Sequence, residues 1–158
     1  MRIGVVNGPN LNLLGIREPE IYGRGTLADL EAYVKAYAGP ADVEIRFSQW
    51  NSEGGVIDEL HALRLWADGV IINPAAFTHY SYAVRDAILG ISLPTVEVHL
   101  SDINKREPFR RISVTEDACI AQIMGLGFDS YIRAIDTLIA HCGGRPSSEK
   151  SSASELMQ

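Results

Sequence analysis

Apolar positions along the chain follow two periods, one typical of buried strands and the other typical of helices. Short runs rich in β-branched residues occupy residues 2–6, 69–72 and 94–100, and a strictly alternating run occupies residues 43–47. A further apolar run at residues 119–124 is a candidate fifth strand. Each run is bounded by Gly, Pro, Asn or Ser, so all five are predicted strands.

Helical spacing of apolar residues fills the segments between these strands. Thr26 with Asp29 three residues later is typical of a capped helix start, and Gly39-Pro40 is expected to end that helix. The later helices have similar polar starts, at Asn51 or Ser52 for the second. The predicted helices cover residues 26–38, 51–65, 81–89 and about 128–141.

Alternating strands and helices require crossover connections, which give a parallel sheet with helices on both faces. The predicted fold is therefore α/β, a flavodoxin-like doubly wound five-stranded parallel sheet in a single domain. Residues 1–142 are expected to form this domain. Residues 143–158 are Ser-rich and almost without apolar residues, so a disordered C-terminal tail is predicted there.

Ligands of doubly wound sheets bind outside the carboxyl ends of the strands, so the loops that begin at Asn7, Asn73 and His99 are the candidate site. The first of them, residues 7–25, is a long loop, and long loops in compact domains are commonly functional or disordered. All three loops carry polar side chains beyond what a turn requires. These are Asn10, Arg17, Glu18, Tyr22 and Arg24, then Asn73, Thr78 and His79, then Glu97, His99, Ser101, Arg106, Arg110 and Arg111.

Taken singly, most of these residues also have a structural interpretation. Asn10 beside Gly-Pro is a common turn residue, and a loop tyrosine such as Tyr22 often packs its ring over a sheet edge. Arg17 is equally compatible with a solvated surface charge, and His79 with a capping residue at the start of a helix. The functional interpretation of these loops therefore depends on their convergence.

Glu97 and His99 form a more specific pattern. They alternate along a predicted strand, which puts both side chains on the same face of an otherwise apolar run. A carboxylate beside an imidazole fixes its tautomer and raises its basicity, which suits a general acid or base, although a structural pair is the alternative. The chain has no HExxH motif, Cys/His cluster or acidic Ca²⁺ loop, so no metal site is predicted.

Composition narrows the chemistry. The 158 residues include 20 acidic and 14 basic side chains, a net charge of −6, which disfavours nucleic acid as a partner. The only lysines are Lys35, Lys105 and Lys150, so most basic residues are arginines, which suit planar anions. A Schiff-base lysine is not expected, and GxxxxGK[ST], GxGxxG and GxSxG motifs are absent. An arginine-rich pocket for a small anion is predicted, with Tyr and His as the candidate proton-transfer groups.

Cysteine usage and hydropathy bear on location. The two cysteines are far apart and form no CxxC, so neither a disulfide framework nor a zinc knuckle is predicted. The N-terminal apolar run is too short for a signal peptide, and no apolar segment is long enough for a membrane span. A cytoplasmic protein with no membrane partner is expected.

Motifs along the whole chain resemble those of the type II 3-dehydroquinate dehydratases, in order and in spacing. They are residues 7–11 (NGPNL), 15–19 (GIREP), 22–23 (YG), 73–79 (NPAAFTH), 85–87 (RDA), 97–101 (EVHLS), 106–111 (REPFRR) and 125–127 (GLG). The resemblance covers residues 1 to about 142. Departures are Ala75, where a glycine is common, and Asp102, where an asparagine is common.

The resemblance implies dehydration of 3-dehydroquinate to 3-dehydroshikimate in the shikimate pathway of aromatic amino-acid biosynthesis, by anti elimination through an enolate, without metal, Schiff base or other cofactor. It implies Tyr22 as the proton acceptor and Arg17 as its activator and transition-state stabiliser. It also implies Asn10 as the stabiliser of the enolate and His99, oriented by Glu97, as the proton donor.

Substrate binding is implied by the same resemblance. Asn73 and the backbone amides of Leu100 and Ser101 would hold the substrate carboxylate. Ring hydroxyls would be held by His79, Arg110 and Asp86, the last from a neighbouring subunit, and Arg106 would belong to the lid or rim of the site. The family forms dodecamers built from trimers, so a homo-oligomer is expected.

Two alternatives from other classes are weighed against this function. A flavodoxin-like module that binds a phosphate or flavin would use the same loops, but the long first loop with Arg17 and Tyr22 does not lead directly into a helix N-terminus. A lysine-dependent dehydratase acting on the same substrate would be inactivated by borohydride in the presence of substrate, which is not expected here.

Overall fold

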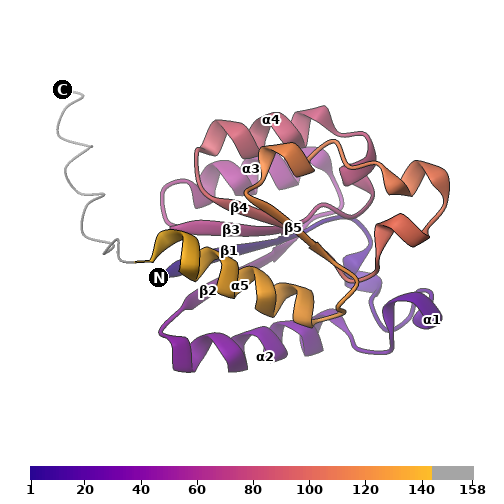
Figure 1. The fold of residues 1–158 in the computed structure, drawn as a ribbon, viewed down its shortest axis with the longest axis horizontal. Helices are drawn as coiled ribbons and strands as arrows, with labels where there is room; N and C mark the ends of the chain where they lie inside the picture. Colours follow the sequence, from indigo (N-terminus) through magenta and orange to yellow (C-terminus); the bar gives the residue numbers. More distant parts are fainter. Residues whose placement is uncertain (144–158) are drawn as a thin grey trace.

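Five parallel strands form one sheet in the computed structural model, which describes residues 1–143. The strand order is β2-β1-β3-β4-β5, so the doubly wound sheet predicted from the sequence is confirmed (Figure 1). The strands are β1 (Arg2–Asn7), β2 (Glu44–Gln49), β3 (Gly69–Asn73), β4 (Thr95–His99) and β5 (Ala121–Met124).

Four longer helices cover the two faces of this sheet, α2 and α5 on one face and α3 and α4 on the other (Figure 1). They are α2 (Leu27–Ala38), α3 (Glu53–Leu63), α4 (Tyr82–Ile91) and α5 (Asp129–Cys142). β3 and β4 are buried along their whole length between these layers, which explains their continuous apolar runs. No helix among residues 1–143 is long and apolar enough to cross a membrane.

The helix starts follow the capping signals in the sequence. The Thr26 hydroxyl accepts from the Asp29 backbone N–H, and the Asp29 carboxylate accepts from the Thr26 backbone N–H, which is the predicted capping box of α2. Ser52 caps α3 and Ser81 caps α4 in the same way, each accepting from a backbone N–H three residues later.

Three local predictions were wrong. The second helix ends at Leu63, and Leu65 lies in the turn that follows, where it is 80% exposed. Residues 7–25 are not a structureless loop, since they contain a 3-10 turn at Leu11–Leu13 and the short helix α1 (Pro19–Tyr22). His79 does not open a helix; it ends the 3-10 turn Ala75–His79 before α4. The predicted tail lies, apart from Gly143, outside the described residues.

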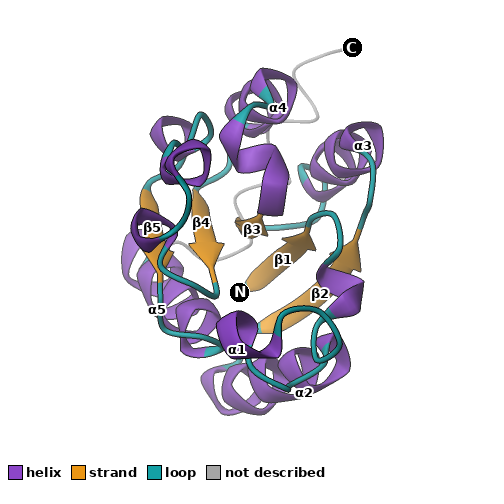
Figure 2. Cartoon of the chain, turned by 90° about the vertical axis from the view of Figure 1, so that its right-hand side faces the viewer, coloured by secondary structure: helices purple, strands orange, loops and turns teal. Residues whose placement is uncertain are grey.

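The strands run in one direction, so their carboxyl ends meet at one edge of the sheet, which Figure 2 views together with α1. β1 pairs with β2 on one side and with β3 on the other, which makes the β1/β3 boundary the point where the winding direction reverses. Ligands of such sheets bind beside this reversal, where the adjacent loops separate.

Candidate active site

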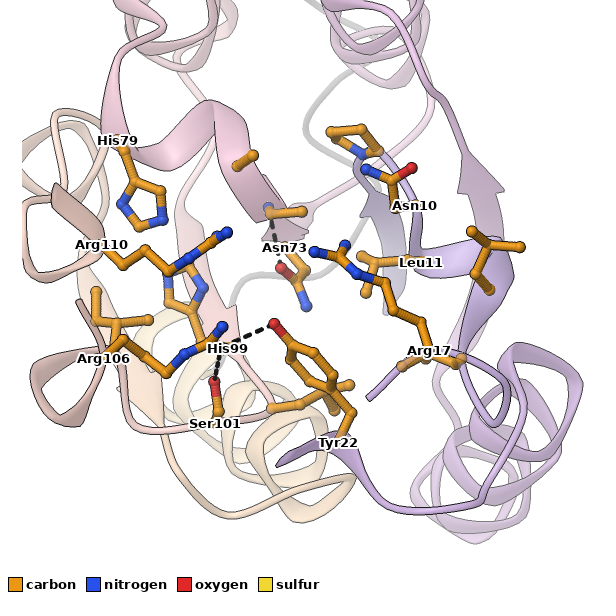
Figure 3. Close-up of a pocket in the computed structure, with 17 residues that line it drawn as sticks. Asn10, Leu11, Arg17, Tyr22, Asn73, His79, His99, Ser101, Arg106 and Arg110 are labelled. Atoms are coloured by element: carbon orange, nitrogen blue, oxygen red, sulfur yellow. Dashed lines mark hydrogen bonds between the residues drawn. The ribbon is translucent and has the colours of Figure 1, made fainter. Parts of the chain in front are cut away.

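A cavity of about 260 Å³ opens at this reversal, between the loops that follow β1, β3 and β4. Its wall contains ten of the residues predicted for the site, and most are labelled in Figure 3. They are Asn10, Arg17, Tyr22, Asn73, His79, His99, Leu100, Ser101, Arg106 and Arg110. The predicted convergence of the three loops is therefore present in the structure.

The Tyr22 hydroxyl points into the cavity from α1 and meets a guanidinium group (Figure 3). Arg106 Nη1 donates to Tyr22 Oη at 2.8 Å and lies 3.4 Å from Ser101 Oγ. Burial alone would lower the pKa of Arg106, but the hydrogen bond and charge of Tyr22 raise it above its ordinary value. The guanidinium thus stays charged beside the phenol oxygen.

Arg17 and Arg110 reach the cavity from opposite sides (Figure 3). Arg17 Nε lies 3.5 Å from a carboxylate oxygen of Glu18, and its side chain is 39% exposed. Arg110 Nε lies 3.0 Å from a carboxylate oxygen of Glu107 and is better covered, at 23% exposed. Together with Arg106 they concentrate positive charge at a cavity in a chain whose net charge is negative.

His99 closes one side of the cavity at the end of β4, backed by Glu97. His99 Nε2 lies 2.6 Å from Glu97 Oε1, and the His99 side chain is 7% exposed. The bond to Glu97 occupies Nε2, so Nδ1 is the ring nitrogen that Glu97 does not engage. The same-face geometry expected from the alternation of these two residues is present.

The Glu97 carboxylate is fully buried and surrounded by donors. Burial would raise its pKa, but the hydrogen bond and charge of His99, with the bonds from Thr115 and Gln122, hold that pKa below its ordinary value. The donors other than His99 are Thr78 at 3.1 Å, Ser113 at 3.0 Å, Thr115 at 2.8 Å and Gln122 at 3.1 Å. Glu97 is thereby kept ionised in a dry environment.

Ser113, Thr115 and Gln122 were missed by the sequence reasoning. Ser113 and Thr115 lie in a segment with no strand or helix pattern, so nothing in the sequence brings them to β4. Gln122 lies in the predicted fifth strand, but its pairing with Glu97 depends on the register between β4 and β5, which no local pattern in the sequence specifies.

His79 lies in the cavity wall with one ring nitrogen already engaged. Its Nδ1 lies 2.7 Å from the carbonyl oxygen of Ile112, so Nδ1 carries the proton and donates. Burial lowers the pKa of His79, and the nearby charges of His99 and Arg110 act in the same direction. The neutral ring therefore offers Nε2 as a hydrogen-bond acceptor.

Asn10 and Asn73 are each held by a hydrogen bond to a neighbouring residue. Asn10 adopts a left-handed conformation, with φ 67°, and its backbone N–H donates to Asn51 Oδ1 at 3.0 Å. Asn73 is 3% exposed, and its Oδ1 accepts from the Ala75 backbone N–H at 3.1 Å. Ala75 has φ 52°, a region that glycine adopts without strain, which explains why glycine suits that position.

Asp86 is the one predicted binding residue that is remote from this cavity. It lies on α4 with its side chain 75% exposed, and its nearest ion-pair partner is Arg85 at 3.5 Å. It borders a shallow depression between α3 and α4. A contribution of Asp86 to a site therefore requires another chain. Among residues 1–143 there is also no group of three or more His, Cys, Asp or Glu placed to hold a metal ion.

Comparison with known proteins identifies the family of the chain. The model of the family described as dehydroquinase class II matches residues 1–139. The chain belongs to the class II dehydroquinase family. It is 54% identical to the 3-dehydroquinate dehydratase of Carboxydothermus hydrogenoformans over 139 residues, which cover 88% of this chain and 90% of that protein. It is 51% identical to the Bacillus cereus (strain AH187) 3-dehydroquinate dehydratase over 138 residues, 87% of this chain and 94% of that one.

The fold of the class II dehydroquinases is shared as well. The crystal structure of the type II dehydroquinase from Butyrivibrio crossotus superposes with a TM-score of 0.86 at 48% identity, covering 87% of this chain and 97% of that one. The family resemblance noted in the sequence motifs is thus confirmed, together with the single-domain α/β architecture.

Proposed function

We propose that this 3-dehydroquinate dehydratase, a hydro-lyase of the shikimate pathway, performs its elimination in the cavity of Figure 3, with Tyr22 as the base. The observation that carries the proposal is the 2.8 Å hydrogen bond from Arg106 to the Tyr22 hydroxyl. An unperturbed tyrosine has a pKa of about 10, so a tyrosine base requires a positive charge that stabilises the phenolate.

Two cations serve this purpose in the proposal. Arg106 donates directly to the phenol oxygen, and Arg17 approaches from the other side of the cavity. A guanidinium that donates to the phenol oxygen favours the phenolate, and the attraction is stronger where water is partly excluded. The phenolate then removes the proton beside the substrate ketone, and Arg17 stabilises the negative charge of the transition state. Arg106 thus acts beyond the lid or rim role expected from the sequence.

The enolate and the leaving hydroxyl are handled by two further groups. Asn10 stabilises the enolate oxygen as a preorganised dipole, since its backbone is fixed by the left-handed turn. His99 gives a proton to the departing C1 hydroxyl, which leaves as water. Its Nε2 is bonded to Glu97, so Nδ1 is the nitrogen that donates, and the ionised Glu97 stabilises positive charge on the ring.

Substrate binding is assigned to the remaining residues of the cavity wall. Asn73 and the backbone amides of Leu100 and Ser101 hold the carboxylate, and Arg110 holds a ring hydroxyl. His79 accepts from a second hydroxyl through Nε2, because its Nδ1 proton is given to Ile112. Among residues 1–143, no lysine lines the cavity, and the proposed elimination forms no Schiff base.

We further propose that the chain works as a dodecamer built from trimers, in which Asp86 reaches the site of a neighbouring subunit. The exposed position of Asp86, far from its own cavity, supports this assignment. A cytoplasmic location is proposed as well, in agreement with a free thiol at Cys119.

The activity is tested by adding 3-dehydroquinate to the purified protein and following the ultraviolet absorbance of the conjugated enone product. The absorbance is expected to rise with a rate proportional to enzyme concentration. It should rise equally after treatment with a chelator and after exposure to borohydride with substrate. Folded protein that gives no signal would contradict the proposed function.

A further inference from the structure

Three buried polar side chains form a connected chain beneath the cavity. Asn7 ends β1 and Asn73 ends β3, and the two residues are directly paired in the sheet. Tyr131, which comes from α5 and is fully buried, bridges them with its hydroxyl. Tyr131 Oη donates to Asn7 Oδ1 at 2.6 Å and accepts from Asn73 Nδ2 at 3.1 Å.

The direction of every bond in this chain is fixed from one end. The Ala75 backbone N–H can only donate, so it requires the oxygen of the Asn73 amide on its side, and the dashed line at Asn73 marks that bond (Figure 3). The Asn73 nitrogen must then face Tyr131, whose single hydroxyl proton is left for Asn7. Reversing the Asn73 amide would place its N–H against the Ala75 N–H. Reversing the Asn7 amide would leave the Tyr131 hydroxyl proton without an acceptor, and both arrangements are costly in a buried setting.

The hydroxyl of Tyr131 is kept as a neutral O–H group, because burial raises the pKa of this tyrosine far above its ordinary value. It is therefore able to donate and accept at the same time. Asn73 Nδ2 carries two hydrogens, one of which is used by Tyr131. The second is available to the cavity that Asn73 lines.

We propose that Tyr131 is a positioning residue for substrate binding, holding the Asn73 amide with its N–H toward the substrate carboxylate. The inference rests on the proposed function, in which Asn73 binds that carboxylate. Without the hydroxyl, the Asn73 nitrogen loses its buried acceptor and the amide is held only by Ala75. Ordering the amide then takes up part of the binding free energy, so substrate binding is weaker. The reacting groups Tyr22 and His99 stay in place.

The test is Tyr131→Phe, assayed with 3-dehydroquinate beside the wild type. KM is expected to rise about tenfold, as for the loss of one ordered hydrogen bond, and kcat to stay within about twofold. Tyr37→Phe is the matched control, because it also removes a 2.6 Å hydroxyl bond to α5, but at the exposed surface. Its KM and kcat should equal those of the wild type.

A double-mutant cycle separates positioning from general weakening of the fold. In an Asn73→Ala background, Tyr131→Phe should cause no further rise in KM, because its effect acts through Asn73. The inference would be overturned if Tyr131→Phe left KM unchanged. It would also be overturned if the rise in KM of the double variant equalled the product of the rises in the two single variants. Since the wild type is measured in the same assay, a failure of the dehydratase function itself is recognised separately.

Asn7→Ala provides a second route if Tyr131→Phe does not fold. Asn7 Nδ2 is buried without a partner, so this substitution also discards an unsatisfied donor. It removes the acceptor that points the Tyr131 proton away from Asn73, so the hydroxyl can turn that proton toward the Asn73 nitrogen and no longer holds the amide in one orientation. KM should rise when Asn7→Ala is made in the wild type, and should not rise further when it is made in Asn73→Ala. A folded Asn7→Ala protein with the KM of the wild type would overturn the inference.

Discussion

At the scale of single residues, the two arginines near Tyr22 differ in their surroundings. The Arg106 side chain is 11% exposed and bonded to the phenol oxygen, whereas the Arg17 side chain is 39% exposed and lies beside Glu18. Charges away from water interact more strongly and are less screened by salt. Arg106 is therefore expected to contribute more than Arg17 to stabilising the phenolate before substrate arrives.

Arg106→Ala should lower kcat/KM at neutral pH by about 100-fold or more, as for the loss of one preorganised charged donor. Steady-state kinetics with 3-dehydroquinate at neutral pH measure this loss. Arg133→Ala, an exposed arginine of α5, is the control and should keep the kcat/KM of the wild type. An Arg106→Ala enzyme with the kcat/KM of the wild type would rule out this role.

At the scale of elements, β4 carries His99, the proposed proton donor. The segment after β4 carries Ser113 and Thr115, whose hydroxyls donate hydrogen bonds to Glu97. Thr115 is fully buried and its hydroxyl donates to Glu97 Oε2 at 2.8 Å. Because the pKa of Glu97 is lowered in the folded chain, its ionisation contributes stability above the ordinary glutamate pKa. That contribution is lost as the pH falls through the folded value.

Thr115→Val should lower the free energy of unfolding at pH 7 by about 1–3 kcal/mol, because one buried donor to Glu97 is removed. The difference from the wild type should stay constant down to the ordinary glutamate pKa. It should narrow below that pH, as the pH falls through the lowered pKa of folded Glu97, since protonated Glu97 gains less from the bond. Urea unfolding across this range is the measurement. Thr115→Ser keeps the hydroxyl and should behave like the wild type, and equal stability of Thr115→Val would contradict the account.

The sequence predicted the elements better than it predicted the contacts between them. Period and capping signals are local, so the strands and the helix starts at Thr26, Ser52 and Ser81 could be found from the chain alone. The Arg106–Tyr22 bond joins residues 84 positions apart, and no local pattern specifies it. The directional chain through Tyr131 was missed for the same reason, because a tyrosine at helical spacing is typical of an ordinary core residue.

At the scale of the whole molecule, the proposed role of Asp86 involves more than one chain. Asp86 cannot serve its own cavity, so its proposed binding role depends on assembly. Sedimentation should give a particle of twelve times the 17.3 kDa chain mass. Asp86→Ala should raise KM about tenfold in assembled enzyme, as for the loss of one hydrogen bond to a charged group. Asp58→Ala, an exposed acid of α3, should leave KM unchanged, and a fully active monomer would contradict the proposal.

The central claim is that the phenol oxygen of Tyr22 takes the proton from the substrate, and Tyr22→Phe tests it most directly. The substitution removes one oxygen atom and keeps the ring between the loops. With 3-dehydroquinate, the rise in enone absorbance should fall by about 1,000-fold or more while the Kd for substrate changes little. Tyr80→Phe, at a residue that is 58% exposed, should react like the wild type. A Tyr22→Phe enzyme with the turnover of the wild type would contradict the account.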